Sequence, residues 1–497
     1  MNPLKILLFI GAVMVCLGGI MFVFPDNGIS ISEDFTMHYP SWKGFWSKNK
    51  AAYTPLPDFV LAADSASTDF LEAEVADTAV PVPLAGDTGK VKLDSLILQK
   101  KIVHRLEFDS CAPNVLHTFF ATLDAASSGQ GIHIVHFGDS QLEGDRMSGY
   151  LRDRLQRQFG GGGPGLISVI PAYNQASVKQ TVSGPWERYT IFGKNITNPA
   201  HTRYGVMGAF SRFTPLLPDS AHTTAYTASA QLITSKGAYP NARVYDYLTV
   251  YYGPTTQPCE IEILSGAEVI VLDTLTGQNK LNTYTLKLDR TAHDIKINFE
   301  SLDGPDIYGF NLDTPEGVTV DNVAMRGSSG TTYTRTDFDV LSGMMKHMNA
   351  TLAIMQFGGN SVPYIQDTTE CVNFGKQFYR QLMVMKRAKP GIGIIVIGPS
   401  DMSFKEGDLY KTYPYLPVLI AEMRKATHDA GGVYWDMYSA MGGAQSMPTW
   451  VNADPPLAVQ DYIHFSPRGA RIMAELFYDA LYTSYYQYQV AQKKEEL

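Results

Sequence analysis

Cysteine is scarce in this chain of 497 residues, which has four, too few for a disulfide scaffold. Charged residues make up only 18%, and 40 Lys and Arg residues stand against 49 Asp and Glu residues, giving a net charge of −9. A nucleic-acid-binding protein needs a concentrated basic face, so we expect no nucleic-acid partner. The Gly-x-Ser-x-Gly elbow of α/β-hydrolases is absent as well. The glycines at 160–163 do not form a phosphate-binding loop, because Pro164 and Gly165 follow where Gly-Lys-Ser/Thr is required.

Hydrophobic residues make up 45% of the chain, enough to bury a core, and the length suggests two or three domains. The chain also contains 28 Tyr, 24 Phe and 43 Gly residues. This composition favours much β structure and many turns beside any helices.

The amino terminus carries the longest apolar run. Residues 6–24 are 19 consecutive uncharged and mostly apolar residues, just long enough to span a bilayer as a helix. We expect residues 1–24 to form an uncleaved transmembrane anchor with residues 25 onward outside the inner membrane. A cleaved signal peptide is the alternative, although it requires a shorter apolar run and a small-x-small site. Cys16 lies in this run, so at most one disulfide can form among Cys111, Cys259 and Cys371.

The segment 25–100 has the composition of a linker. Residues 51–89 contain no Lys or Arg but seven acidic residues, with Ala, Pro, Ser and Thr around them. We expect a solvated tether there, and a stretch packed loosely on the neighbouring domain is the alternative.

An α/β pattern begins near residue 101. Short apolar runs at 132–137, 351–357 and 392–397 each end in a loop that contains glycine, which is typical of buried parallel strands. Amphipathic helical patterns follow at 147–159, 374–385 and 468–482. The alternation predicts a parallel sheet with helices on both faces, built from residues 101–169 and 319–485 and followed by a polar tail at 486–497.

Residues 170–318 interrupt this pattern. Turn residues separate short runs rich in Thr, Val, Tyr and Ile, and no long helical period intervenes; the runs include 247–252, 260–264, 269–272 and 294–299. We therefore expect an inserted β-sandwich. Trp186, Tyr251 and Tyr252 are candidates for stacking on sugar rings, but aromatics at strand spacing are more often core residues.

Three polar motifs lie where an esterase would place its catalytic groups. Ser140 follows the first predicted strand, at the edge of the sheet where α/β proteins bind ligands. Asn360 follows another strand, and its side chain can donate to an oxyanion. Asp461 and His464 stand three residues apart, so the carboxylate can fix the tautomer of the imidazole.

These motifs resemble those of the SGNH (GDSL-type) hydrolase family. The match comprises Gly138-Asp139-Ser140, Gly358-Gly359-Asn360 and Asp461-x-x-His464, over roughly residues 130–165 and 320–485. The resemblance implies a three-layer α/β/α fold. It also implies that Ser140 is the nucleophile, His464 the base and Asp461 its partner, with the Ser140 amide and Asn360 donating to the oxyanion.

Other site residues follow from the same resemblance. A further oxyanion donor should be a glycine amide, and Gly330 fits this role better than Gly327 because a short polar residue follows it. We also expect Asp139, Gly327, Gly359 and Asp401 to line the cleft. Ser361 departs from the Asp that many members carry after the Asn.

Neither a metal nor a cofactor is expected. His133 and His136 stand three apart on a predicted strand, so they project to opposite faces of the sheet and cannot chelate one metal ion.

Three functions remain open at this point. An acyl-enzyme on Ser140 makes an esterase if water attacks it and a transferase if a sugar hydroxyl does. SGNH enzymes with an inserted β-sandwich resemble bacterial peptidoglycan O-acetylesterases. We therefore expect an enzyme of the bacterial cell envelope, with its catalytic part in the periplasm or outside the cell, acting on an acetylated glycan. An O-acetyltransferase working with a membrane acyltransferase partner, and an inactive anchored glycan-binding protein, are the alternatives.

Overall fold

The computed structural model of the chain describes residues 3–23, 29–32, 35–37, 55–57, 60, 104–126, 129–195, 197–216, 224–289 and 292–495. By its internal contacts the chain divides into two units, residues 1–54 and 55–497. Most of the predicted tether at 25–100 lies outside the described residues.

The first unit holds one long helix and a small hairpin. Helix α1 (Pro3–Val23) covers the predicted anchor, and strands β1 (Ile29–Ser32) and β2 (Phe35–Met37) pair antiparallel. Within the described residues, no helix combines the length and the apolar character that a membrane crossing requires. The prediction of a transmembrane helix is therefore not supported.

A five-stranded parallel sheet forms the centre of the second unit. Its strands lie in the order β15-β3-β16-β17-β20, and every neighbouring pair is parallel. The strands are β3 (Ile132–Gly138), β15 (Val318–Ala324), β16 (Ala350–Gln356), β17 (Gly393–Ile397) and β20 (Val433–Trp435). The predicted mixed α/β fold with a parallel sheet is confirmed.

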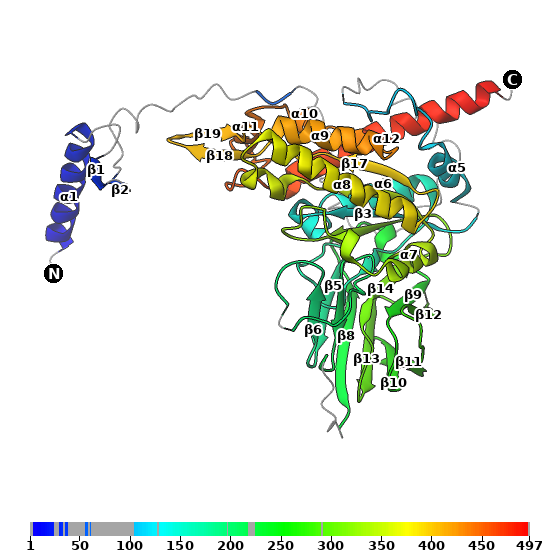
Figure 1. Cartoon of the computed structure of the whole chain (residues 1–497). Coiled ribbons are helices and arrows are strands. Elements are labelled where there is room, and N and C mark those ends of the chain that lie inside the picture. Colours follow the sequence, from blue (N-terminus) through cyan, green and yellow to red (C-terminus); the bar gives the residue numbers. More distant parts are fainter. Residues whose placement is uncertain are drawn as a thin grey trace. The chain divides into compact units, whose positions relative to one another are not determined.

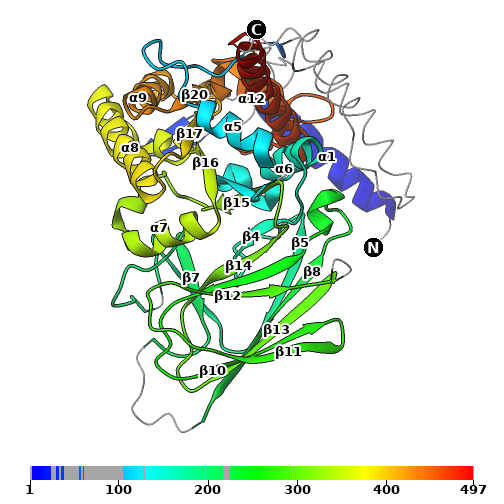
Figure 2. The same ribbon diagram turned by 90° about the vertical axis from the view of Figure 1, so that its right-hand side faces the viewer.

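Helices cover both faces of this sheet (Figure 2). Ile132 and Ile134 of β3 face one core, whereas Val135 and Phe137 face the other, as the two-residue period of a strand requires. The first core also contains residues of α5 (His117–Ala126), α6 (Ser148–Phe159) and α12 (Pro467–Glu495). The second contains residues of α7 (Phe338–His347), α8 (Thr368–Ala388) and α9 (Leu416–Asp429). Helix α12 extends through most of the predicted polar tail.

Two antiparallel sheets follow β3 and α6 in sequence and precede β15 (Figure 1). One has the order β11-β10-β13-β8-β5, and the other has the order β12-β9-β14-β7-β6 with β4 also paired to β14. The first comprises β5 (Val178–Ser183), β8 (Tyr226–Thr234), β10 (Cys259–Ser265), β11 (Glu268–Leu275) and β13 (Asp294–Ser301). The second comprises β4 (Gly165–Ile167), β6 (Glu187–Thr190), β7 (Ala209–Arg212), β9 (Tyr247–Tyr252), β12 (Asn282–Lys287) and β14 (Ile307–Asp313). The inner faces of both sheets contribute to one apolar core, so this part is a β-sandwich.

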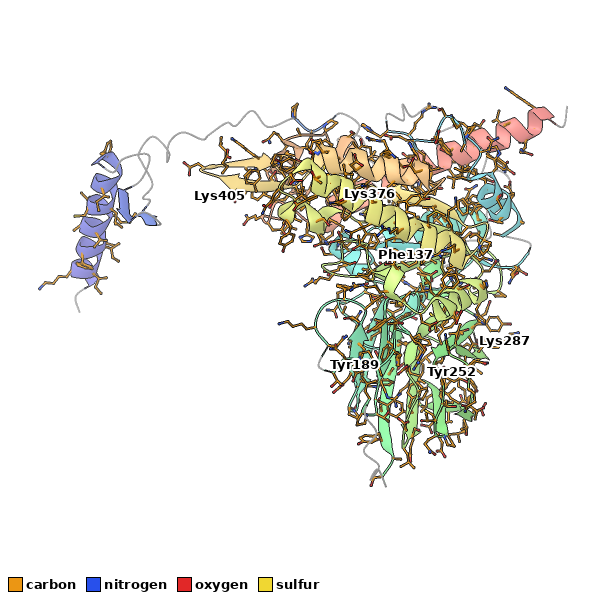
Figure 3. All side chains as sticks on the ribbon, in the orientation of Figure 1. Phe137, Tyr189, Tyr252, Lys287, Lys376 and Lys405 are labelled. Atoms are coloured by element: carbon orange, nitrogen blue, oxygen red, sulfur yellow. The ribbon has the colours of Figure 1, made fainter. Side chains whose placement is uncertain are left out.

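Three aromatic residues of the sandwich pack against apolar neighbours. Tyr251 and Tyr252 are buried, and the Trp186 ring lies edge-on to Phe213 and Phe299. Figure 3 shows Tyr252 among the sandwich strands and Phe137 in the α/β part. Tyr251 and Tyr252 are therefore core residues, and Trp186 is a half-buried residue packed against the core.

His133 joins the sandwich to the parallel sheet. Its Nδ1 lies 2.8 Å from Asp321 of β15, and its Nε2 lies 3.2 Å from Asp313 of β14. Burial lowers the pKa of His133, but the two carboxylates outweigh burial and raise it to about 10. His136 projects to the opposite face, as predicted, where it contacts the Gln356 and Ser148 side chains.

The second unit also contains several shorter elements. They are the 3₁₀ helices η1 (Ser140–Asp145), η2 (Asn241–Arg243), η3 (Tyr333–Arg335) and η4 (Gly359–Tyr364), the hairpin β18 (Ser403–Glu406) and β19 (Leu409–Thr412), and helices α10 (Met437–Ala440) and α11 (Ser446–Val451). Of these, η1, η4 and the hairpin adjoin the site described next.

Candidate active site

Ser140 stands directly after β3, where the strand turns into η1. The Asp139 side chain accepts a hydrogen bond from the Gln141 amide at 3.0 Å and caps this turn. Gly138 allows the tight exit, because a Cβ there would come within 2.5 Å of the Leu142 side chain. The turn thereby presents the Ser140 hydroxyl at the carboxyl edge of the sheet.

His464 and Asp461 meet Ser140 from a turn that precedes α12. The Ser140 Oγ lies 2.6 Å from His464 Nε2, and His464 Nδ1 lies 2.6 Å from Asp461 Oδ2. The three side chains thus form the relay that the sequence predicts, although Ser140 and His464 are 324 residues apart. The predicted nucleophile, base and orienting carboxylate are therefore within hydrogen-bonding reach of one another.

Asp461 is held in its ionised form. Its Oδ1 accepts from the amides of Ile463 (2.9 Å) and His464 (3.0 Å). Partial burial raises the pKa of Asp461, but the hydrogen bonds from the amide and the ring of His464 outweigh burial and lower it. An ionised Asp461 keeps the Nδ1 proton on His464, which leaves Nε2 free to accept the Ser140 proton.

Asn360 lies in η4, beyond the end of β16. Its Nδ2 donates to Asp139 Oδ2 at 3.0 Å and to the Ser328 carbonyl at 3.1 Å. Burial raises the pKa of Asp139 to about 6, partly opposed by the Gln141 amide. The predicted oxyanion donor therefore lies beside Ser140, but both of its N–H groups are engaged, so one must leave its present acceptor before it can bind an oxyanion.

The two candidate glycines of the loop after β15 differ in position. Gly330 is buried, its amide donates to Ser328 Oγ at 3.2 Å, and a Cβ there would meet the Phe357 ring at 2.4 Å. Gly327 is exposed and has open space where a Cβ would lie. Gly330 does not line the cavity beside Ser140, and its role as an oxyanion donor stays a prediction.

A cavity of about 150 Å³ opens beside the relay. Ser140, His464, Asn360, Asp139 and Gly359 all line it. Its remaining walls are mainly apolar or amide side chains: Gln141, Gln356, Phe357, Pro363, Tyr364, Pro399, Ser400, Met402, Met437 and Ile463. Such a pocket suits a small acyl group next to the nucleophile.

Asp401 does not line this cavity, contrary to the prediction that it is a cleft residue. Its side chain is fully buried and accepts hydrogen bonds from Thr412 Oγ1 (2.7 Å) and the Met447 amide (2.8 Å). Burial raises the pKa of Asp401 to about 6. Since Thr412 ends β19, Asp401 anchors the β18–β19 hairpin rather than contacting a substrate.

The hairpin in turn supports the turn that carries His464. Tyr410 of β19 stacks on Tyr462, with ring centroids 3.4 Å apart and planes 9° apart, and the Ser403 amide donates to the Tyr462 carbonyl at 3.1 Å. Tyr462 has a φ of +59°, a conformation that costs a non-glycine residue free energy. The stacking helps to hold it there.

Several residues near the site were not anticipated from the sequence. Gln141 and Arg146 bridge the two catalytic turns, and the exposed Tyr364 stands on the cavity rim. Gln141 and Tyr364 could have been found from the sequence, since each closely follows a predicted motif residue.

Across the described part of the chain, no cluster of His, Cys, Asp and Glu side chains is arranged to hold a metal ion. Cys16, Cys111, Cys259 and Cys371 are all free thiols.

No family model and no curated protein matches the chain. A solved structure of a peptidoglycan O-acetylesterase matches with a TM-score of 0.57 and 19% identity, over 76% of this chain and 97% of that chain. A family two carbohydrate esterase from Cellvibrio japonicus matches 62% of this chain and 98% of its own, with 9% identity and a TM-score of 0.24. A putative GDSL-like lipase from Parabacteroides merdae matches 33% of this chain and 72% of its own, with 14% identity and a TM-score of 0.24. The TM-scores of these last two matches are too low to support a shared fold. The first match and the arrangement of Ser140, Asn360, Asp461 and His464 lead to one conclusion: the chain has the fold of the SGNH hydrolases.

Proposed function

We propose that this protein is a serine esterase that removes O-acetyl groups from a cell-envelope glycan. The observation that carries the proposal is the relay from Asp461 through His464 to Ser140, with both hydrogen bonds at 2.6 Å, opening onto a small cavity. A structural serine at a turn needs neither a histidine base nor an orienting carboxylate, so the complete set favours catalysis.

The relay supports a two-step reaction. His464 Nε2 takes the Ser140 proton as Oγ attacks the acyl carbonyl carbon. The Ser140 amide donates to the oxygen that becomes negative, and so does Asn360 once one of its N–H groups has turned from the Ser328 carbonyl or from Asp139. When the ester C–O bond breaks, His464 returns the proton to the departing sugar oxygen and leaves an acetyl group on Ser140. A water molecule then attacks this acetyl group, with His464 again as base. Acetate leaves and Ser140 recovers its proton.

The cavity favours a short acyl group. It measures about 150 Å³, and Phe357, Met402 and Met437 contribute apolar surface to it. An acetyl group fits such a space beside Ser140, whereas a long acyl chain requires a far larger one.

The rim of the cavity favours a sugar as the alcohol part of the ester. Tyr364 lines the cavity with 79% of its surface exposed, so its ring is free to cover a sugar face. The fold likeness to a peptidoglycan O-acetylesterase supports the same substrate class. An acetylated glycan is therefore the proposed partner, and location in the bacterial envelope and a membrane acyltransferase partner stay predictions.

Acetate release from O-acetylated peptidoglycan and from a small chromogenic acetyl ester tests the proposal, with full-length wild type beside Ser140→Ala. We expect wild type alone to release acetate from both substrates. If the acetyl group is transferred to an added glycan instead of to water, the protein is a transferase rather than an esterase. Equal rates for wild type and Ser140→Ala would contradict the catalytic assignment.

A further inference from the structure

The side chain of Gln141, the residue after Ser140, hydrogen-bonds the backbone on either side of His464. Gln141 is 8% exposed. Its Nε2 donates to the Ile463 carbonyl at 2.8 Å, and its Oε1 accepts from the Phe465 amide at 3.3 Å. The residue after the nucleophile thus holds the backbone on both sides of the base.

Arg146 makes a second bridge between the same two turns. Its Nη2 donates to the Ser140 carbonyl at 2.8 Å and its Nη1 to the Phe465 carbonyl at 3.0 Å, while its Nε donates to the Glu143 carbonyl at 2.7 Å. The planar guanidinium has its donors in a fixed geometry, so one side chain sets the spacing of three carbonyl groups.

We propose that Gln141 and Arg146 are positioning residues that clamp the His464 turn onto the Ser140 turn and so set the distance between Ser140 Oγ and His464 Nε2. The clamp rests on the proposed esterase function, because it acts through these two residues. Neither residue exchanges a proton with the substrate in this scheme.

Other contacts hold this turn as well, such as the bond from the Val459 amide to the His464 carbonyl at 2.8 Å, but Gln141 and Arg146 tie it to the turn that carries Ser140. His464 lies outside the helices and strands, between Tyr462 in the left-handed conformation and the start of α12 at Pro467. A displacement of about 1 Å at a catalytic contact can lower a rate about 100-fold. The four clamp bonds to residues 140, 463 and 465 hold this contact through backbone atoms rather than through the reacting side chains.

Gln141→Met and Arg146→Lys test the clamp, since they keep most side-chain volume and, for Arg146, the charge. Two matched controls lie away from the cleft. Gln381→Met removes a buried amide that contacts the Thr334 amide at 3.1 Å, and Arg243→Lys removes a guanidinium that donates to the Ala238 and Lys236 carbonyls.

For the clamp variants we expect kcat on a chromogenic acetyl ester to fall about 10- to 100-fold, with KM within about twofold of wild type. The rate at which a fluorophosphonate labels Ser140 should fall in parallel. The controls should lose thermal stability to a similar degree and keep kcat. Clamp variants that keep kcat within about twofold at temperatures below their melting point would overturn the proposal, because only a structural role would remain.

Nitrogen-15 NMR of the histidine side chains separates failure of the clamp from failure of the esterase proposal. If wild type releases no acetate, the esterase proposal fails, yet His464 still reports the contact with Ser140. We expect the His464 ring resonances to shift in both clamp variants and to stay in place in both controls. Unchanged His464 resonances in the clamp variants would refute the clamp whatever the activity.

Discussion

Replacing Asp461 with asparagine should stop proton transfer while leaving the turn folded. The carbonyl oxygen of the introduced side chain can still accept from the Ile463 and His464 amides, which now donate to Asp461 Oδ1 at 2.9 and 3.0 Å. The new amide nitrogen, however, faces His464 Nδ1, where Asp461 Oδ2 now accepts at 2.6 Å. Since an amide NH2 can only donate, the ring must carry its proton on Nε2, and Nε2 then cannot accept the Ser140 proton.

The size of the loss in kcat depends on how well water can stabilise the charged His464 ring in place of Asp461. In the serine-protease triad, where the aspartate is buried, the same change lowers kcat about 10⁴-fold. The Asp461 side chain is 42% exposed and that of His464 is 29% exposed, so water can partly stabilise the charged ring. We therefore expect a loss of about 10²- to 10³-fold in kcat, equivalent to about 3 to 4 kcal/mol.

The assay is steady-state hydrolysis of a chromogenic acetyl ester, with thermal melting in parallel. Asp408→Asn, an exposed carboxylate between β18 and β19, is the matched control and should keep wild-type kcat. Retention of more than about a third of wild-type kcat by the folded Asp461→Asn variant would refute the role of Asp461.

Four further predictions follow from the geometry. Burial raises the pKa of Asp401 to about 6, so ionising Asp401 destabilises wild type as the pH rises from about 4 to 6. Over this pH range the unfolding free energy of Asp401→Asn should rise relative to wild type by up to about 3 kcal/mol. A difference in denaturant titrations that does not change with pH would contradict this. Tyr410→Leu should lower the unfolding free energy by about 1 kcal/mol and lower kcat several-fold, because it removes the ring that stacks on Tyr462. An unchanged kcat would show that this stacking does not support the turn that carries His464. Asp313→Asn should lower the unfolding free energy by about 3 kcal/mol below pH 6.5, because His133 is protonated below its raised pKa, and by less as the pH rises towards about 10. The kcat should stay unchanged. Equal unfolding free energies for the variant and wild type at pH 6 would refute the ion pair between His133 and Asp313. Tyr364→Ala should raise KM about fivefold for an O-acetylated glycan and leave it unchanged for the small ester, so equal effects on both substrates would argue against sugar stacking.

The sequence predicts the layers of the fold and the relay for a simple physical reason. Strands 132–137 and 351–357 are buried apolar runs, and parallel strands end at a common edge, so Ser140 and Asn360 must lie near each other. The three-residue spacing of Asp461 and His464 likewise fixes a local contact that needs no tertiary information.

The remaining contacts depend on side-chain directions that spacing does not fix. Asp401 follows a strand just as Ser140 does, but its side chain turns under the sheet edge towards Thr412 instead of into the cavity. The roles of Gln141 and Arg146 appear only when two turns more than 300 residues apart are seen together.

The central claim is that His464 activates Ser140 as a nucleophile, and fluorophosphonate labelling followed by peptide mass spectrometry tests it most directly. The full-length wild type should carry one label, on the peptide that contains Ser140, and His464→Ala should label at least about 100-fold more slowly. Absence of the label from folded wild type, or an equal labelling rate for wild type and His464→Ala, would contradict the account.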